Sequence, residues 1–174
     1  MKKRFLKILL NLLIITGFSC SVNADISTQN LTTLTPEDLA NLLVGEGITI
    51  SNVTYTGANV AAGTFTGGDG IIGFKDGIIL SSGDVANVIG PNLQDGITKD
   101  NGMLIPGYTT YDATVLEFDF IPVGNTVTFK YVFASDEYNE FVHSSFNDVF
   151  AFYINGVNYA VLPDGTPVAI NNIN

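Results

Sequence analysis

The chain has 174 residues, of which 46% are hydrophobic and 14% charged, and its formal net charge at pH 7 is −10. Such an acidic protein repels phosphate groups, which excludes nucleic acid and anionic membrane surfaces as favoured partners and leaves divalent cations, basic partners and neutral sugars. The single Cys excludes a disulfide within the chain, so stability must come from a packed core or a bound metal.

An export signal is predicted for residues 1–24. Its basic start holds Lys2, Lys3, Arg4 and Lys7, its apolar run extends from Phe5 to Phe18, and Val22-Asn23-Ala24 matches a small-residue cleavage site. The apolar run is too short for a transmembrane anchor. Cleavage after Ala24 leaves 150 residues with a net charge of −14, because 4 of the 7 basic residues and none of the 17 acidic residues lie in the signal. We therefore expect a secreted or cell-surface protein; the alternative is a lipoprotein signal acylated at Cys20.

The start of the mature chain, residues 25–34, is polar and Thr-rich and predicts a flexible N-terminal segment. A short helix is predicted next, with Thr35 as N-cap, Pro36 at the first helical position and two acidic residues in the first turn. Three Leu residues form its apolar stripe, and Gly45 or Gly47 is expected to end it. We expect this helix to cover one end of a β domain.

From residue 48 onward, β-branched and aromatic residues in period-2 alternation predict strands. The expected strands are Ile48–Tyr55, a hairpin within Ile71–Ser82 that turns at Asp76-Gly77, Val115–Ile121, Val127–Phe133, Val149–Ile154, Val157–Leu162 and Val168–Ile170. Tight turns at Asn155-Gly156 and Asp164-Gly165 join the last three, and Val85–Ile89 is expected to form one helical turn. The Gly residues at 57, 63, 67, 68 and 70 are interpreted as turns that bracket a strand. Together these elements predict an all-β fold, an antiparallel β-sandwich or jelly roll with a short N-terminal helix.

The connection between the strands Val127–Phe133 and Val149–Ile154 gathers four carboxylates and two amides. They belong to Asp136, Glu137, Asn139, Glu140, Asn147 and Asp148. If the two strands pair antiparallel, the two ends of this connection converge, and calcium needs the six to eight oxygen ligands that such side chains supply. We therefore predict a calcium site from Asp136 and Glu137 at one end and Asn147 and Asp148 at the other, completed by Glu140 or a backbone carbonyl. The alternative is a solvated acidic turn.

Aromatic residues in or near loops are candidates for ligand contact. They are Tyr108, Tyr111, Tyr138, Phe141 and Phe146. Exposed rings stack on sugars or anchor protein partners, and we predict this role for Tyr138 and Phe141 with Asn139 between them. The alternative is that the rings cover the open end of the sandwich.

Two enzymatic interpretations carry less weight. Asp112, Glu117 and Asp119 offer carboxyl pairs for glycoside hydrolysis, but alternation places Glu117 and Asp119 on the outward face of a strand, which explains them more simply. His143, the only His, would need a Ser and Asp136 to form a hydrolase triad, and no G-x-S-x-G motif accompanies it. We therefore expect no enzymatic activity.

Five segments occur in the order and spacing of a known family. They are Ile71–Phe74, Gly77–Gly83, Tyr111-Asp112, Phe133–Tyr138 and Phe146–Phe152. On these residues the chain from Leu39 to Asn174 resembles the choice-of-anchor L domain of secreted bacterial proteins. The resemblance implies an exported, β-rich surface module that is normally followed by more of the domain and then by an anchor, and it implies no established reaction.

The resemblance and the residue patterns together predict one domain over residues 35–174, incomplete at its C-terminus, with the anchor in a region beyond it. The predicted function is a non-catalytic module for adhesion or ligand binding, stabilised by calcium, with a glycan or a surface protein as partner. Two alternatives remain open, a carbohydrate-active hydrolase that uses the loop carboxylates and a structural spacer within a larger surface protein.

Overall fold

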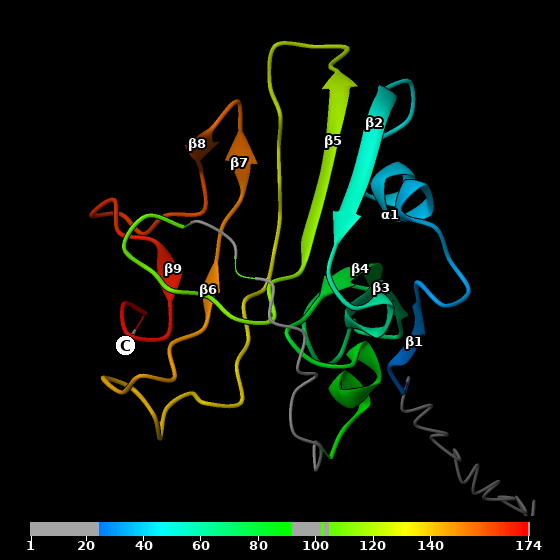
Figure 1. The fold of residues 1–174 in the computed structure, drawn as a ribbon. Coiled ribbons are helices and arrows are strands. Elements are labelled where there is room, and N and C mark those ends of the chain that lie inside the picture. The colour runs from blue at the N-terminus through cyan, green and yellow to red at the C-terminus, as the bar shows by residue number, and fades with distance from the viewer. Residues whose placement is uncertain (1–24, 92–101, 103–104, 174) are drawn as a thin grey trace, which may run out of the picture.

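The computed structural model describes residues 25–91, 102 and 105–173, so the predicted export signal lies outside the described residues. In chain order the elements are β1 (Ser27–Asn30), α1 (Pro36–Leu43), β2 (Thr49–Thr56), η1 (Asn59–Ala61), β3 (Ala62–Thr66), β4 (Asp76–Leu80), η2 (Val85–Ile89), β5 (Val115–Ile121), β6 (Val149–Phe150), β7 (Tyr153–Ile154), β8 (Val157–Asn158) and β9 (Val168–Ala169) (Figure 1). No helix in this part of the chain is long and apolar enough to cross a membrane.

The strands form one three-stranded sheet, in the order β1-β3-β4, and three two-stranded sheets, β2-β5, β6-β9 and β7-β8, all antiparallel. The fold is mostly β with one short helix, as predicted. The predicted sandwich or jelly roll is not found: the described residues form several small sheets and no closed sandwich. The physical reason lies in residues 127–133, which carry a strand pattern but pair with no described strand, so no ladder joins the strands before residue 122 to those after residue 148.

Helix α1 begins where its capping residues predict. The Thr35 hydroxyl accepts a hydrogen bond from the Asp38 amide at 3.2 Å, and the Asp38 carboxylate accepts one from the Thr35 amide at 2.8 Å, which completes a capping box. This second hydrogen bond holds the pKa of the Asp38 carboxyl below its ordinary value. The helix ends at Leu43, with Val44 as its C-cap, so neither Gly45 nor Gly47 caps it.

The segment 25–34 differs from the flexible start that its composition predicts, because four of its residues form β1. The flanking residues Ile26 and Leu31 are buried, and the Leu31 amide donates to the carbonyl oxygens of Asn59 at 3.0 Å and Ala62 at 3.1 Å. These two apolar side chains flank β1, whose own four residues are all polar, and the polar composition is why the sequence did not predict the strand.

The hairpin predicted at Asp76-Gly77 is wrong. Asp76–Leu80 is a single strand, β4, and its partner is the preceding strand β3, in the register Thr66↔Asp76 to Ala62↔Leu80. The chain reverses in residues 67–75, where the amides of Ile71 and Ile72 both donate to the carbonyl oxygen of Gly68. Gly63 lies inside β3, so its interpretation as a turn residue is wrong as well.

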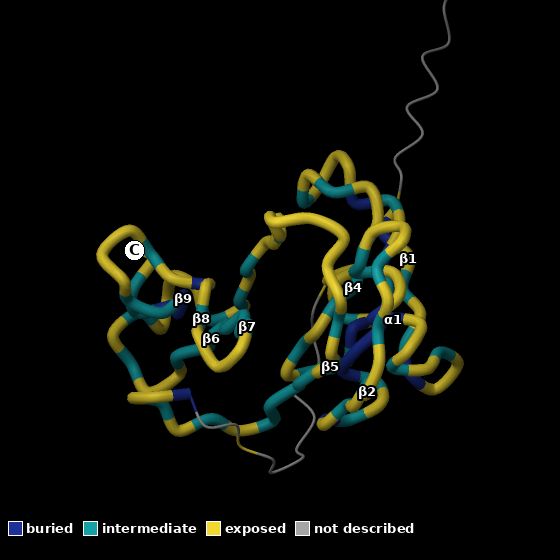
Figure 2. Tube along the Cα trace, turned by 90° about the horizontal axis from the view of Figure 1, so that it is seen from above, coloured by how far each residue is buried: buried dark blue, intermediate teal, exposed yellow. Residues whose placement is uncertain are grey.

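The hydrophobic core lies between α1 and the sheets of the N-terminal half. Leu31, Leu39 and Ala62 form a buried cluster, and the partly buried side chains packed against it include Tyr55 of β2 and Leu116 of β5. The buried positions of this half gather beneath α1 and between β2, β4 and β5 (Figure 2). Strand β5 is confirmed as predicted, with Leu116, Phe118 and Phe120 on its less exposed face.

The C-terminal half follows its predicted turns. The Asn155-Gly156 turn, with φ of 50° and 79°, joins β7 to β8, and Gly165, with φ of 86°, lies in the turn before β9. The expected strand Val149–Ile154 is divided into β6 and β7. The helical turn expected at Val85–Ile89 is confirmed as the 3-10 helix η2.

Candidate functional site

The loop between residues 135 and 149 brings two predicted ligand residues together at its base. The Ser135 hydroxyl oxygen lies 2.8 Å from Glu137 Oε2 and 2.7 Å from Asp148 Oδ2, and it accepts a hydrogen bond from the Glu137 amide at 3.1 Å. A hydroxyl group has one proton, so Ser135 donates to only one of these carboxyl groups at a time. The second short contact requires an additional proton or a cation.

The electrostatics of this carboxyl pair favour neutralisation. Burial raises the pKa of the Asp148 carboxyl above its ordinary value, and the contact with Glu137 and the charge of Asp136 raise it further. The hydrogen bond from Ser135 opposes these effects. Any group that neutralises Asp148, whether a proton or a metal ion, therefore stabilises the closed base of the loop.

Of the remaining predicted calcium ligands, Asp136 lies near enough for its charge to act on Asp148, whereas Asn147 and Glu140 have other surroundings. Asn147 Oδ1 accepts a hydrogen bond from the Asn171 amide at 2.9 Å, and Glu140 is exposed, as is Asn139, which was predicted to contact a ligand rather than calcium. Within the described ranges, no group of three or more His, Cys, Asp or Glu side chains is placed to hold a metal ion. Calcium binding therefore stays a prediction.

Three aromatic side chains of the loop lie at the surface. Tyr138, Phe141 and Phe146 are 48%, 46% and 60% exposed. Phe141 and Phe146 pack edge to face, with ring centroids 5.4 Å apart, and Tyr138 borders a cavity of about 420 Å³ beside Ser135. The loop itself is a series of turns, in which the Phe141 amide donates to the Glu137 carbonyl oxygen at 2.9 Å and the Ser144 amide donates to the Phe141 carbonyl oxygen at 3.0 Å.

The C-terminal segment holds this loop, which the sequence analysis missed. The Asn171 side chain accepts a hydrogen bond from the His143 amide at 2.6 Å and donates one to the Ser144 carbonyl oxygen at 3.3 Å, in addition to its backbone contact with Asn147. The first of these bonds stabilises His143 in a left-handed conformation, with φ of 65°. Asn side chains bind backbone groups readily, so the Asn pair that follows β9 was the available signal.

The other sequence candidates have structural contacts of their own. Asp119, on the exposed face of β5, accepts a hydrogen bond from the Asn52 side chain at 2.6 Å, and Glu117 lies on the same face. The Tyr108 hydroxyl oxygen accepts a hydrogen bond from the Asn172 side chain at 3.0 Å. For His143, the structure gives a hydrogen bond from the backbone amide and none from the imidazole to a described Ser or Asp.

We expect Asn171→Ala to release the loop from the C-terminal segment. The change removes two side-chain hydrogen bonds, and such bonds contribute about 1 kcal/mol each to stability. The free energy of unfolding should therefore fall by about 2 kcal/mol, and hydrogen exchange at the His143 amide should accelerate. Asn172→Ala is the matched control, because it removes bonds to Tyr108 and Pro167 instead. Unchanged exchange at His143 in Asn171→Ala would contradict this role.

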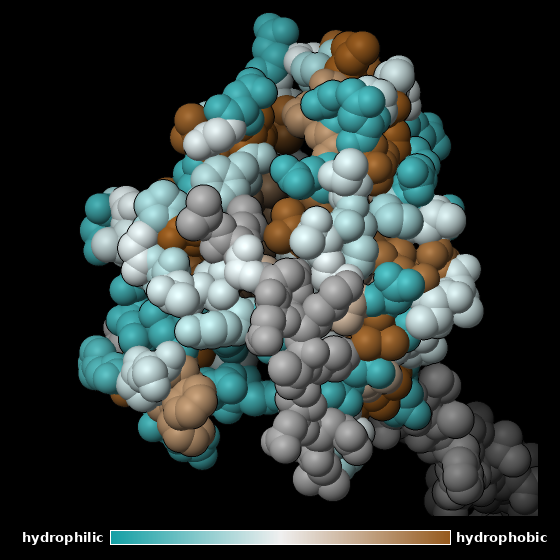
Figure 3. All heavy atoms as spheres, in the orientation of Figure 1, coloured by the Kyte–Doolittle hydropathy of each residue, from teal (hydrophilic) through white to brown (hydrophobic). Residues whose placement is uncertain are grey.

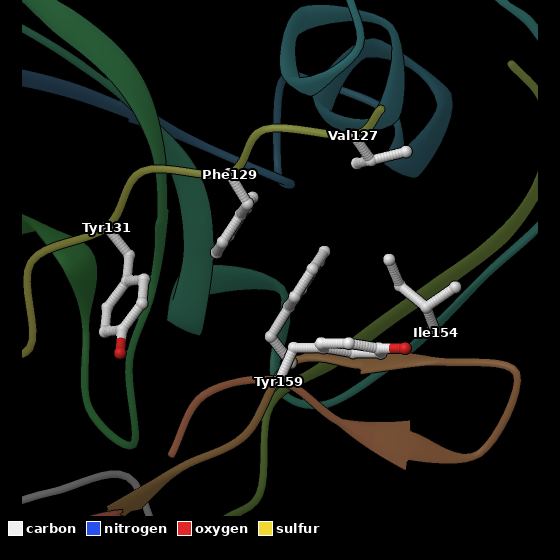
Figure 4. Close-up of a pocket in the computed structure, with 6 residues that line it drawn as sticks. Val127, Phe129, Tyr131, Ile154 and Tyr159 are labelled. Atoms are coloured by element: carbon white, nitrogen blue, oxygen red, sulfur yellow. The ribbon is translucent and has the colours of Figure 1, made fainter. Parts of the chain in front are cut away.

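A second cavity, of about 360 Å³, lies between residues 127–131 and the β7-β8 hairpin. Figure 4 shows Val127, Phe129 and Tyr131 in a row on one side, facing Ile154 and Tyr159 on the other. The lining includes Phe152, whose ring stacks on that of Phe129 with centroids 4.0 Å apart. The side chains that line this cavity are apolar apart from the two Tyr hydroxyl groups.

Comparison with known proteins gives one match. No curated protein and no solved structure matches the chain. The sequence profile of the Choice-of-anchor L domain matches residues 25–174, which is most of the chain and includes every described element. The chain belongs to the choice-of-anchor L domain family.

Proposed function

We propose that this domain is a non-catalytic binding module that contacts a glycan or protein ligand through the aromatic side chains of the 136–148 loop. Its family is one of surface-anchored or secreted protein modules. The observation that carries the proposal is the pair Phe141 and Phe146, two large apolar rings packed against each other and about half exposed. Rings of this kind are frequent anchors of binding surfaces, because they bury a large area with little loss of conformational entropy.

The hydrogen bonds around the loop support this role. Turns within the loop and the Asn171 side chain fix the backbone on both sides of Phe141 and Phe146. A loop held in this way loses little conformational freedom on binding, which favours affinity. Asn139, exposed beside Tyr138, supplies amide groups for a polar contact with the ligand.

Calcium is the second component of the proposal. A calcium ion bound at Glu137 and Asp148 would satisfy the carboxyl group that the single Ser135 proton leaves without a donor. Both residues supply the oxygen ligands that calcium prefers, and nearby loop carbonyls and water complete such shells. The ion would then lock the base of the loop that presents Tyr138 and Phe141.

Binding of the full chain to a glycan array and to a panel of immobilised extracellular-matrix proteins tests the proposal. We expect Phe141→Ala to weaken binding at least tenfold, because truncating a central aromatic anchor removes about 2 kcal/mol or more. Tyr111→Ala is the matched control, since Tyr111 is an aromatic residue outside the loop and is 71% exposed. Equal binding by both variants would contradict the aromatic contact. Release of sugar products would favour the hydrolase instead, and no binding at all would favour the spacer.

A further inference from the structure

Residues 122–134 bend at 123–125 and then continue as an extended segment that makes no hydrogen bond to a described residue. No backbone or side-chain group in this segment bonds to any other described residue or pairs with a described strand. The segment leaves the end of β5 and descends beside β7 and β6 (Figure 1). Most of its residues are exposed, so a row of backbone donors and acceptors is available there. Such a row is the usual template for pairing with a further strand.

The side chains of this segment already have partners on one face. Phe129 stacks on Phe152 with ring centroids 4.0 Å apart, and Tyr131 packs on Phe150 at 4.7 Å, so the segment runs antiparallel to β6 and β7 and faces them through its rings. In an extended strand, side chains project perpendicular to the direction of the backbone hydrogen bonds. The rings therefore hold the segment against β6 and β7 although its backbone makes no hydrogen bond to a described residue.

We propose that residues 127–133 are a docking strand, to which an extended segment of a partner protein adds by backbone hydrogen bonds. This inference rests on the proposed function as a binding module. It adds to the aromatic loop a second contact surface, at which the partner binds by strand addition. Strand addition supplies affinity through the backbone and selectivity through alternate side chains. The alternate residues of an added strand would extend the apolar layer formed by Val127, Phe129 and Tyr131, which Figure 4 shows on one side of the segment.

Charge selects the kind of partner. The docking strand leads directly into the acidic loop, with Asp136, Glu137 and Glu140 beyond its end. A partner strand with Lys or Arg at the end that meets this loop is therefore favoured. A second copy is disfavoured, because antiparallel pairing about the centre of the strand places Lys130 opposite Lys130 and brings together two chains of net charge −10. The expected occupant is a basic, β-branched segment of a different protein.

Hydrophobic side chains at the upper end of the molecule also reach the surface near this strand. Ile121 and Val123, which precede the docking strand, and Val157 in β8 are all more than half exposed. Figure 3 shows hydrophobic residues at the surface in this part of the view. A strand that continued past Val127 would cover some of this apolar area.

Selection of a random twelve-residue peptide library against the immobilised full chain tests the docking strand. We expect enriched peptides to alternate β-branched and polar residues and to carry Lys or Arg at one end. On addition of a synthetic enriched peptide, amide exchange should slow at every second residue of 127–133. N-methylation of alternate peptide residues should weaken binding at least a hundredfold for one set of positions and leave it within threefold for the other, because one peptide edge faces the docking strand.

Three results would overturn the inference. The first is that no selected peptide protects the amides of residues 127–133 from exchange. The second is that both methylated peptides bind as tightly as the unmethylated one. The third is that these amides become protected when the protein concentration is raised without peptide, which would identify the occupant as a second copy. Phe141→Ala separates this inference from the proposed function, because strand addition predicts that the peptide still binds this variant. If Phe141→Ala instead abolishes peptide binding and the amides stay unprotected, the aromatic loop is the binding surface and the docking strand is wrong.

Discussion

Replacing Gly63 with Ala is expected to lower the free energy of unfolding by about 3 kcal/mol, at the upper end of the cost of overpacking. Gly63 lies in β3 opposite Asn30 of β1. A Cβ atom at this position would overlap the backbone carbonyl oxygen of Gln29 and lie 2.9 Å from the Cα atom of Asn30. Because both obstacles are backbone atoms, the side chain cannot move aside, and β1 must separate from β3.

Thermal unfolding of the full chain measures this effect. For a domain of this size, a loss of 3 kcal/mol lowers the midpoint by roughly 10 °C. Gly70→Ala is the matched control, since no atom lies within 4 Å of the position its Cβ would take. The two variants make the same chemical change, so equal midpoints would contradict the close approach of β1 to β3.

The elements that the sequence predicted correctly are those whose signals are local. Helix α1 is specified within a few residues by Thr35, Pro36 and Asp38, and its capping box forms as the spacing requires. Strand β5 is specified by alternation alone, whereas its register against β2 shifts between Ser51 and Thr54, which alternation does not predict. In both cases a short stretch of sequence contains all the groups that form the element.

The incorrect secondary-structure predictions concern residues whose conformation is determined by contacts with residues distant in the sequence. Gly77 follows Asp76, a dipeptide typical of tight turns, yet a Cβ there would lie 3.1 Å from the ring of Phe65, so this Gly accommodates a ring on the neighbouring strand. Strand β1 was missed because the segment around it is polar, and only Ile26 and Leu31 at its ends are buried. Neither interaction leaves a local signal.

In the candidate site, too, features with a local signal were predicted and those that depend on distant contacts were not. The loop ends converge at the contact of Ser135 with Asp148, but the strand pairing from which alternation predicted this convergence does not form, because residues 127–133 contact β6 and β7 through their rings. The support from Asn171 was not predictable, because it links residues 24 to 28 positions apart through side-chain hydrogen bonds. Such contacts depend on the tertiary arrangement of β6 and β9.

Neutralisation of the Glu137 and Asp148 pair is expected to control the stability of the C-terminal half. The pKa of Asp148 is raised in the folded state, so its contribution to stability is fully present below the pKa of an unfolded Asp, about 3.9, and is lost as the pH rises through the folded value. The free energy of unfolding should therefore decrease between pH 4 and neutral pH through this group, by no more than about 1.4 kcal/mol per pH unit.

Asp148→Asn should remove this component of the pH dependence, because the amide is neutral at every pH and donates a hydrogen bond toward Glu137. The matched control is Asp164→Asn, in an exposed turn whose hydrogen bonds with Thr166 hold the pKa of the carboxyl below its ordinary value. The Asp164 carboxyl of the wild type therefore has the opposite effect on the pH dependence: its contribution to stability is lost as the pH falls, and Asp164→Asn should remove that loss. Denaturant unfolding from pH 4 to 8 measures both, and identical pH profiles for wild type and Asp148→Asn would contradict the raised pKa.

Calcium and a proton would neutralise the same oxygen atoms, so the two effects can be separated in one series. At pH 7, calcium at a hundred times its dissociation constant should raise the free energy of unfolding of the wild type by about 2.7 kcal/mol relative to chelator, since it binds the folded state. The effect should shrink toward pH 4 as protons displace the ion, and it should be absent in Asp148→Asn and retained in Asp164→Asn. If calcium changes nothing at any pH while the proton effect remains, the base of the loop is closed by a shared proton, and the aromatic surface it carries requires no metal.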